Sequence, residues 1–279
     1  MLPDEAKMIS VVIPTHNRIR QLKRCLRSLL SQSYEDYEIM VSANRCTDGT
    51  LAYVRKRMEN DDRIRLAITS KRGINIARNA GIKESAGELI AFIDDDAVAE
   101  KDWLKNASRF YSDSDHKIYG GRITNLHKKN MVSRVQQAIF DLDKRKDRQF
   151  SGISGSNMFI HKSIFDKHGL FDEDYVYGAS ETDFFYRCRK ERFGYDGSIV
   201  VYHGWRKSLF DYMRASFRMG RSHGRYNRSI GKPFKRRLGR YWVDESLRLA
   251  DRFSGLEKLE AFSIVTLFKL SFLLGRLRY

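Results

Sequence analysis

Cysteine and proline are both scarce in this sequence. The 279 residues include only three prolines and three cysteines. The cysteines are odd in number, far apart and without a CxxC pair, at Cys25, Cys46 and Cys188. This pattern excludes a disulfide framework and a cysteine zinc site, and it favours a reducing compartment. The length fits one large α/β domain, alone or with an appendage.

Signals for export and for membrane spanning are also missing. The N-terminal residues MLPDEAKM lack the basic and apolar regions of a signal peptide. The longest apolar stretch, Phe262 to Gly275, contains Lys269 and falls short of the roughly 20 residues that a spanning helix needs. We therefore expect a cytoplasmic protein, attached at most peripherally to the inner face of the cell membrane.

Several common catalytic motifs do not occur. No GxGxxG follows a strand, and GxxxxGK[ST] and HExxH are absent. These absences exclude the dinucleotide fingerprint, the P-loop and the HExxH metalloprotease signature.

Basic residues, in contrast, are abundant and unevenly placed. The formal net charge is +17, and residues 204–279 alone hold 18 Lys+Arg against 6 Asp+Glu. Such a charge raises the alternative of a nucleic-acid-binding protein. However, no zinc-finger, RRM or KH pattern is present, so we expect no nucleic-acid partner. The sequence instead predicts a nearly balanced domain over residues 1–204 and a basic, mostly helical C-terminal extension over residues 205–279.

Apolar strand-like runs alternate with amphipathic helical patterns. Strands are expected at 8–13, 38–42, 63–69, 88–93, 118–123, 151–160 and 198–202. Helices are expected at 19–30, after 46–50, and at 74–85, 103–110, 132–142 and 181–192. This alternation predicts an α/β fold with a mostly parallel central sheet that helices cover on both faces. Ligands bind such sheets at the carboxyl ends of the strands.

Unusual polar residues follow two of the expected strands. In VVIPTHNR, Asn17 and Arg18 lie where a helix should begin, and a helix N-terminus suits a phosphate. An ordinary helix cap by Thr15 or Asn17 explains the same residues equally well. Asp94, Asp95 and Asp96 follow the apolar run ELIAFI. Three adjacent carboxylates at a buried strand end indicate Mg²⁺ or Mn²⁺ rather than a solvated turn.

Further polar candidates lie later in the chain. Glu181 and Asp183 begin an expected helix, and His203 ends the last expected strand. Acids near a helix N-terminus are often only complements of its dipole. With the common motifs excluded, these polar residues indicate a site in which carboxylates hold a metal ion that binds a phosphorylated ligand.

Six motifs in order resemble those of the family 2 inverting glycosyltransferases, which have the GT-A fold, with its Rossmann-like nucleotide-binding half, and use nucleotide-diphosphate sugars. They are VVIPTHNR, CTDGT, RGINIARNAGIKESAGELIAFIDDDA, GSNMFIHKSIFDKHGLFDED, SETDFFYR and VVYHGW. The resemblance covers about residues 8 to 205. It implies a transferase that moves a sugar from a nucleotide-diphosphate sugar to an acceptor hydroxyl, with Mn²⁺ or Mg²⁺ as cofactor.

The resemblance also implies roles for individual residues. The donor's nucleotide would contact Pro14, Thr15, Asn17, Arg18, Arg78, Asp94 and Asp95. In the family's DXD motif the last acid binds the metal, which is Asp96 here, and His203 matches a position that approaches the metal or the diphosphate. A cation between Asp96 and a diphosphate would stabilise the charge of the leaving nucleotide.

Two departures from the family pattern leave alternatives open. An inverting transfer needs a general base for the acceptor hydroxyl, and the family's Glu-Asp pair reads Ser180-Glu181 here. Glu181 is our candidate, and Asp183 is the alternative. Ala43 stands where many members have an Asp that binds uracil. A GDP or dTDP sugar therefore stays open, as does base recognition by Asn44.

The C-terminal extension contains an arginine stripe. Its members are spaced by 4, 3, 4 and 3 residues and share one face of an expected helix: Arg214, Arg218, Arg221, Arg225 and Arg228. Such a face suits anionic phospholipids or a lipid-linked acceptor, although charge runs are usually only solvated. Residues 262–277 could pack on the enzyme domain, on another subunit of a homo-oligomer or on a membrane.

The sequence thus predicts a metal-dependent inverting glycosyltransferase acting on a lipid-linked or cell-surface glycan. The alternative is a nucleotidyltransferase or another enzyme that binds nucleotide sugars. A nucleotidyltransferase would release pyrophosphate instead of a nucleoside diphosphate.

Overall fold

The computed structural model describes residues 8–146, 153–231 and 246–277. It divides into two compact units that interleave along the chain. Unit 1 contains Met1–Thr124, Gln149–Val176 and Ser180–His203. Unit 2 contains Asn125–Arg148, Tyr177–Ala179 and Gly204–Tyr279. The expected domain boundary at residue 204 stays a prediction, because the division describes packing and not independent folding.

Unit 1 is built on a sheet with the strand order β3-β2-β1-β4-β7-β6-β8-β5. Its strands are β1 (Ile9–Thr15), β2 (Tyr37–Asn44), β3 (Ile64–Thr69), β4 (Leu89–Phe92), β5 (Ala97–Ala99), β6 (Ile118–Asn125), β7 (Met158–His161) and β8 (Phe193–His203). The first four strands in this order are parallel. β7 is antiparallel to both β4 and β6, and β5 is antiparallel to β8. The α/β class is confirmed, but the sheet is mixed rather than mostly parallel.

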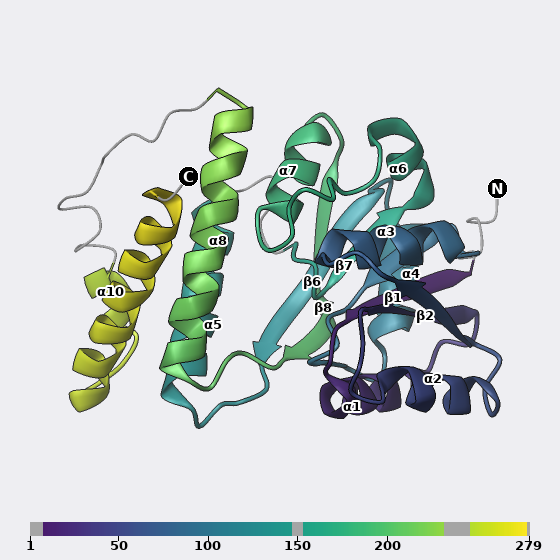
Figure 1. Ribbon diagram of the computed structural model, residues 1–279, viewed down its shortest axis with the longest axis horizontal. Coiled ribbons are helices and arrows are strands. Elements are labelled where there is room, and N and C mark those ends of the chain that lie inside the picture. Colours follow the sequence, from purple (N-terminus) through teal and green to yellow (C-terminus); the bar gives the residue numbers. More distant parts are fainter. Residues whose placement is uncertain (1–7, 147–152, 232–245, 278–279) are drawn as a thin grey trace. The chain divides into compact units, whose positions relative to one another are not determined.

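Both faces of this sheet are covered, as the near-continuous apolar strands require. Alternate side chains of β1 point to opposite faces, so Val11 packs in one cluster and Val12 in the other. The first cluster includes residues of α1 (Ile19–Leu29), α2 (Thr50–Met58) and α4 (Trp103–Ser112). The second includes residues of α3 (Ile74–Glu84), α6 (Lys162–His168) and α7 (Ser180–Arg187). Figure 1 shows α1 and α2 together beside the parallel strands.

Several expected elements differ in extent. The strand expected at 151–160 begins only at Met158; its first two residues lie outside the described residues, and Ser154 and Asn157 form an isolated bridge. α7 ends at Arg187, five residues early, because the chain enters β8 at Phe193. The sequence did not predict β5 or α6, which are too short to show a clear period.

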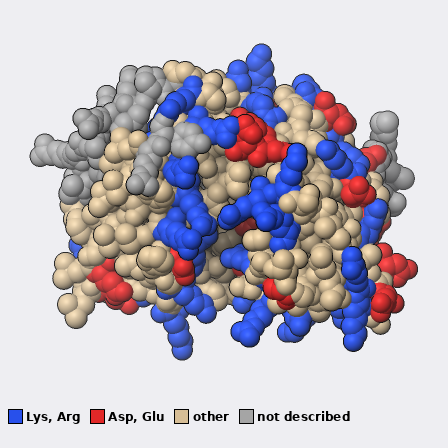
Figure 2. Space-filling model, in the orientation of Figure 1, with Lys and Arg blue, Asp and Glu red and all other residues tan. Residues whose placement is uncertain are grey.

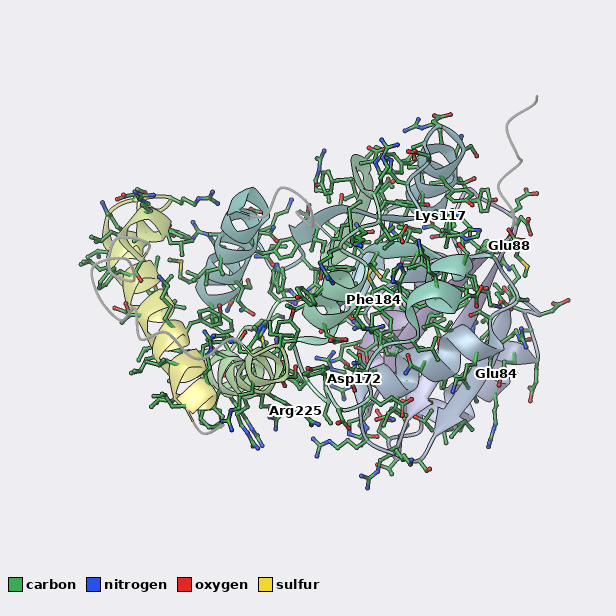
Figure 3. All side chains as sticks on the ribbon, turned by 90° about the horizontal axis from the view of Figure 1, so that it is seen from above. Glu84, Glu88, Lys117, Asp172, Phe184 and Arg225 are labelled. Carbon is green, nitrogen blue, oxygen red and sulfur yellow. The ribbon has the colours of Figure 1, made fainter. Side chains whose placement is uncertain are left out.

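Unit 2 consists mainly of helices in the residues that are described. It contains α5 (Met131–Lys146), α8 (Leu209–Ser229), a short helical stretch at 246–250 and α10 (Leu256–Leu277). Figures 1 and 3 both show α8 beside α10. Gly220 of α8 lies against the backbone of Phe272, and Gly275 of α10 lies against that of Phe217. None of the helices in the described ranges combines the length and the hydropathy that spanning a bilayer requires.

Candidate functional site

The acidic run Asp94–Asp96 connects β4 to β5 and lies next to the end of β1. Thr15, the last residue of β1, donates from Oγ1 to Asp95 Oδ2 at 2.7 Å. The Nη1 group of Arg18 donates to Asp95 Oδ1 at 2.7 Å and to Asp96 Oδ2 at 2.9 Å. Three residues that the sequence placed around the nucleotide therefore form one hydrogen-bonded group with Asp96.

Burial dominates the electrostatics of Asp95. The residue is only 3% exposed. Burial raises the pKa of Asp95 to about 6; Asp96 acts in the same direction, while Arg18 and Thr15 oppose it. Burial lowers the pKa of Arg18, but the neighbouring carboxylates of Asp95 and Asp96 outweigh it and raise that pKa overall. The arginine thus partly compensates a concentration of negative charge that the fold creates.

Asp94, Asp96 and His203 form the part of the site that is open to a cation. One ligand atom from each of them lies within 4.8 Å of the others. His203 Nε2 is 3.3 Å from Asp94 Oδ2 and 3.4 Å from Asp96 Oδ1. The antiparallel pairing of β5 with β8 places Ala97 opposite His203, which brings the histidine to the acids. Burial would raise the pKa of Asp94, but His203, Arg78 and Arg18 together lower it.

A divalent cation fits this donor set. Asp96 Oδ1 is buried and accepts no hydrogen bond, whereas its other oxygen is held by Arg18. A buried carboxylate oxygen without a hydrogen bond is costly, and a metal ion would satisfy it. Carboxylate oxygens with one imidazole nitrogen suit Mn²⁺, and Mg²⁺ prefers oxygen ligands alone. Asp94, which the family resemblance assigned to the nucleotide, belongs to this donor set.

The loops after β1 and β2 are tied to each other. Asn17 has a positive φ of 52° and accepts a hydrogen bond from the Thr47 backbone N–H at 2.6 Å. His16 Nδ1 lies 2.6 Å from the carbonyl oxygen of Asn44. Pro14, inside β1, pairs in register with Ser42 of β2. These contacts fix the backbone beside the acidic run.

The Asn44 side chain has protein partners. Its amide donates to Thr69 Oγ1 at 2.6 Å and to the Lys71 carbonyl at 2.5 Å, and its oxygen accepts from the Gly73 N–H at 3.2 Å. Ala43 is fully buried. Recognition of a nucleotide base by Asn44 would therefore compete with the contacts that connect β2, β3 and α3.

A second cluster joins α3 to the start of α7. Arg78 Nη1 is 3.0 Å from Glu181 Oε1 and donates to Ser180 Oγ at 3.2 Å. Ser180 Oγ donates in turn to Asn75 Oδ1 at 2.5 Å. Arg78 is thus the partner of the candidate base, a contact that the sequence did not predict. The spacing of Asn75, Arg78 and Asn79, three buried polar residues on one face of a helix, was the available signal.

Asp183, the alternative base, has a different partner. Its Oδ2 accepts a hydrogen bond from Arg187 Nε at 3.0 Å, one turn along α7. Arg187 also donates to the carbonyl oxygen of Leu170 at 2.9 Å. Asp183 therefore belongs to a contact that connects α7 to the loop after α6.

The arginine stripe lies in unit 2, on α8. Four of its members are exposed and Arg225, labelled in Figure 3, is half-buried. Arg218 also lies over the ring of Tyr177, 5.9 Å from its centroid. The helix that carries the stripe is continuous through Gly220 and Gly224, although glycine lowers helix propensity.

Comparison with known proteins identifies a protein family that the sequence matches. The model described as "Glycosyl transferase family 2" matches residues 10–169. A Methanococcus voltae protein named dolichyl N-acetyl-alpha-D-glucosaminyl phosphate 3-beta-D-2,3-diacetamido-2,3-dideoxy-beta-D-glucuronosyltransferase is 27% identical, over 77% of this chain and 73% of its own length. The GalNAc(5)-diNAcBac-PP-undecaprenol beta-1,3-glucosyltransferase of Campylobacter jejuni is 26% identical, over 62% of this chain and 57% of its own length.

Solved structures share the fold. A mannosyltransferase from Pyrobaculum calidifontis, in complex with GDP-Man and Mn²⁺, matches 99% of this chain and 88% of its own with a TM-score of 0.70 at 16% identity. TarS residues 1–349 of S. aureus match 96% of this chain and 89% of their own with a TM-score of 0.60 at 16% identity. This likeness confirms the GT-A type of fold.

Proposed function

Because the chain belongs to glycosyl transferase family 2 and is a glycosyltransferase, we propose that it transfers the sugar of a nucleotide-diphosphate sugar, with inversion and with the help of Mn²⁺ or Mg²⁺. The observation that carries the metal dependence is the group of Asp94, Asp96 and His203. Asp96 Oδ1, buried and without a hydrogen bond, is the oxygen best prepared for a cation. When bound, the cation would neutralise charge on the departing diphosphate.

Glu181 is the residue that we assign as general base. Its side chain is 29% exposed, so an acceptor can approach it. As the acceptor oxygen attacks the anomeric carbon, its proton passes to the Glu181 carboxylate. The bond between the anomeric carbon and the diphosphate oxygen breaks, and its electron pair leaves with the nucleoside diphosphate. Asp183 stays the alternative, held by Arg187.

Arg18 and Asp95 are proposed to hold the nucleotide side of the donor, together with Pro14, Thr15, Asn17 and Asp94. Arg18 is well placed because its side chain is 41% exposed while it contacts Asp95 and Asp96. Ala43 gives no hydrogen bond to a uracil, which keeps GDP and dTDP sugars among the candidate donors. The structural neighbour that holds GDP-Man and Mn²⁺ supports testing guanosine first.

The acceptor is proposed to be a lipid-linked glycan at an anionic membrane surface. Relatives are named for dolichyl phosphate and undecaprenol diphosphate substrates. In unit 2, the exposed arginines of α8 would contact anionic headgroups. Exposed leucines of α10 add an apolar face: Leu256, Leu259, Leu270, Leu274 and Leu277. We propose that α8 and α10 dock the enzyme peripherally; the cytoplasmic location stays a prediction.

Ligand binding and turnover test the metal assignment together. We expect one of UDP, GDP and dTDP to raise the thermal unfolding temperature only with Mn²⁺ or Mg²⁺, because a ligand of the folded state stabilises it. Asp96→Asn should abolish that shift and slow release of the nucleoside diphosphate from its sugar donor by about 10²-fold or more. Asp166→Asn, at an exposed position on α6, is the matched control.

Two outcomes would contradict the proposal. Full activity of Asp96→Asn at saturating Mn²⁺ would refute the metal site. Release of pyrophosphate in place of a nucleoside diphosphate would identify a nucleotidyltransferase.

A further inference from the structure

Arg78 is enclosed by protein on α3. Its side chain is only 2% exposed, in contrast to the 29% of Glu181, with which it pairs at 3.0 Å. The guanidinium carbon lies over the ring of Phe171, 5.5 Å from the centroid. The carboxylate is therefore accessible to a substrate, whereas the guanidinium has little surface left for a diphosphate.

Gly155 closes the other side of the pair. A Cβ atom at this position would overlap Arg78 Nη2 and Glu181 Oε1. The neighbouring Asn157 fixes this turn, because it donates to the carbonyls of Arg122 and Ile199 and accepts from Trp103 Nε1 at 2.9 Å. The backbone at Gly155 thus forms a wall against which the two charged groups lie.

From this arrangement we infer that Arg78 is a positioning residue that acts through Glu181, and not a nucleotide contact. The inference rests on the proposed function, because it concerns the base of that reaction. Arg78 holds Oε1, which leaves Oε2 to receive the acceptor proton. Ser180 of α7 accepts a hydrogen bond from the arginine and donates one to Asn75 of α3, which fixes the serine. A base fixed in this way rarely adopts an orientation in which it cannot accept the proton.

Variants of Arg78 distinguish the two roles. Arg78→Met should lower kcat by about 10²-fold, within the range of general-base contributions, while KM for the donor and Kd for the nucleoside diphosphate change less than about twofold. Arg78→Lys should recover part of kcat, because lysine keeps the charge but not the forked geometry. Arg65→Met is the control: Arg65 pairs with Glu38 at 2.9 Å in the same unit, away from Glu181.

The Glu181→Gln background sharpens the test. If Arg78 acts only through Glu181, adding Arg78→Met to Glu181→Gln should lower the residual rate no further. Additive losses, or a Kd for the nucleoside diphosphate weakened tenfold or more by Arg78→Met, would overturn the inference. A wild-type protein that releases no nucleoside diphosphate from any sugar donor would refute the proposed function itself, which separates the two failures.

Gly155→Ala approaches the same pair without removing a charge, and it serves if the arginine variants do not fold. The added methyl group should displace the carboxylate and lower kcat while Kd for the nucleoside diphosphate stays unchanged. Gly197→Ala on β8 is its control, because the nearest atom there is the mobile end of Arg122 at 3.2 Å. Unchanged kcat in Gly155→Ala would show that the orientation of Glu181 does not matter.

Discussion

Glu38 shows how one residue can stabilise the parallel half of the sheet. It is 6% exposed on β2. Its Oε1 accepts hydrogen bonds from Ser10 Oγ at 2.5 Å and from the Ala86 N–H at 2.6 Å, and Arg65 donates to Oε2 at 2.9 Å. Burial alone would raise the pKa of Glu38, but these three donors outweigh it and lower that pKa. The ionised carboxylate therefore connects β1, β2, β3 and the turn before β4.

We expect Glu38→Gln to lower the free energy of unfolding at neutral pH by about 1–3 kcal/mol, the cost of disrupting a buried charged hydrogen-bond group. Because the folded-state pKa is lowered, this stabilisation is full above the unfolded-state pKa of about 4.3 and is lost as the pH falls through the folded-state value. Urea unfolding from pH 7 downward should therefore show the difference between variant and wild type shrinking in acid.

Glu84→Gln is the control for this experiment. Glu84, labelled in Figure 3, is exposed at the end of α3, and its substitution should change stability by less than about 0.5 kcal/mol. A difference for Glu38→Gln that stays constant with pH would contradict the assignment.

At the same scale, the sequence predicted the participants of the site better than their partners. Asp94, Asp95 and Asp96 follow an apolar strand, and that position alone marks them. The pairing of Arg18 with Asp95, 77 positions away, depends on which strands lie side by side. The pairing of Arg78 with Glu181 depends on the packing of α3 against α7. The spacing of polar residues on a helix can mark such residues, but it does not indicate which residue each of them pairs with.

Among the elements, the crossing of α8 and α10 depends on glycine at two close approaches. Gly220 lies against backbone atoms of Phe272 and Arg276, and Gly275 lies against those of Phe217. The backbone cannot move aside as a flexible side chain can. Glycine in a helix interior lowers helix propensity, and the close packing explains why α8 contains Gly220 and α10 contains Gly275.

We expect Gly220→Ala to destabilise the protein by about 1–3 kcal/mol, the usual cost of overpacking. On an exposed helix surface the same change would stabilise by about 1 kcal/mol through helix propensity, so the sign of the effect is informative. Thermal or urea unfolding measures it. Arg214→Ala, at an exposed position of α8, should have little effect. A more stable Gly220→Ala would contradict the close crossing.

The parallel strands were predictable because each is a compact apolar run followed by a helical period. β1 to β3 show this pattern, whereas β4 is an apolar run that the acidic residues end. The antiparallel half was not predictable, because the direction of β7 between β4 and β6 follows from long-range pairing and not from composition. β5 has three residues and pairs with β8 across about a hundred positions. It is nevertheless the strand that brings His203 to the acidic run.

At the scale of the whole molecule, the net charge of +17 matters through the surfaces on which the basic side chains lie. Figure 2 shows lysine and arginine side chains outnumbering acidic ones across the visible face. Residues 204–279 contain 18 basic and 6 acidic residues. We propose that this basic part of the chain binds an anionic surface. Each basic residue near such a surface contributes about 1 kcal/mol, and salt screens the attraction.

Flotation with vesicles tests this proposal. We expect the protein to float with vesicles of phosphatidylcholine and phosphatidylglycerol, not with phosphatidylcholine alone, and less so at high salt. Reversing three exposed charges of α8 (Arg214→Glu, Arg218→Glu and Arg221→Glu) should abolish flotation. The matched control changes the net charge equally in unit 1 (Lys56→Glu, Lys83→Glu and Lys105→Glu). Equal loss in both variants would show that net charge, and not α8, drives binding.

The interleaving of the two units has a consequence for the order in which the chain is made. Val132, Val135 and Ala138 of α5 are buried in one cluster with Ala261 and Ile264 of α10. During synthesis α5 leaves the ribosome more than a hundred residues ahead of these partners. Part of its apolar side therefore stays uncovered until α10 has been made. A transcript that ends before α10 would give a protein in which the parallel strands are complete but apolar side chains of α5 are exposed and prone to aggregation.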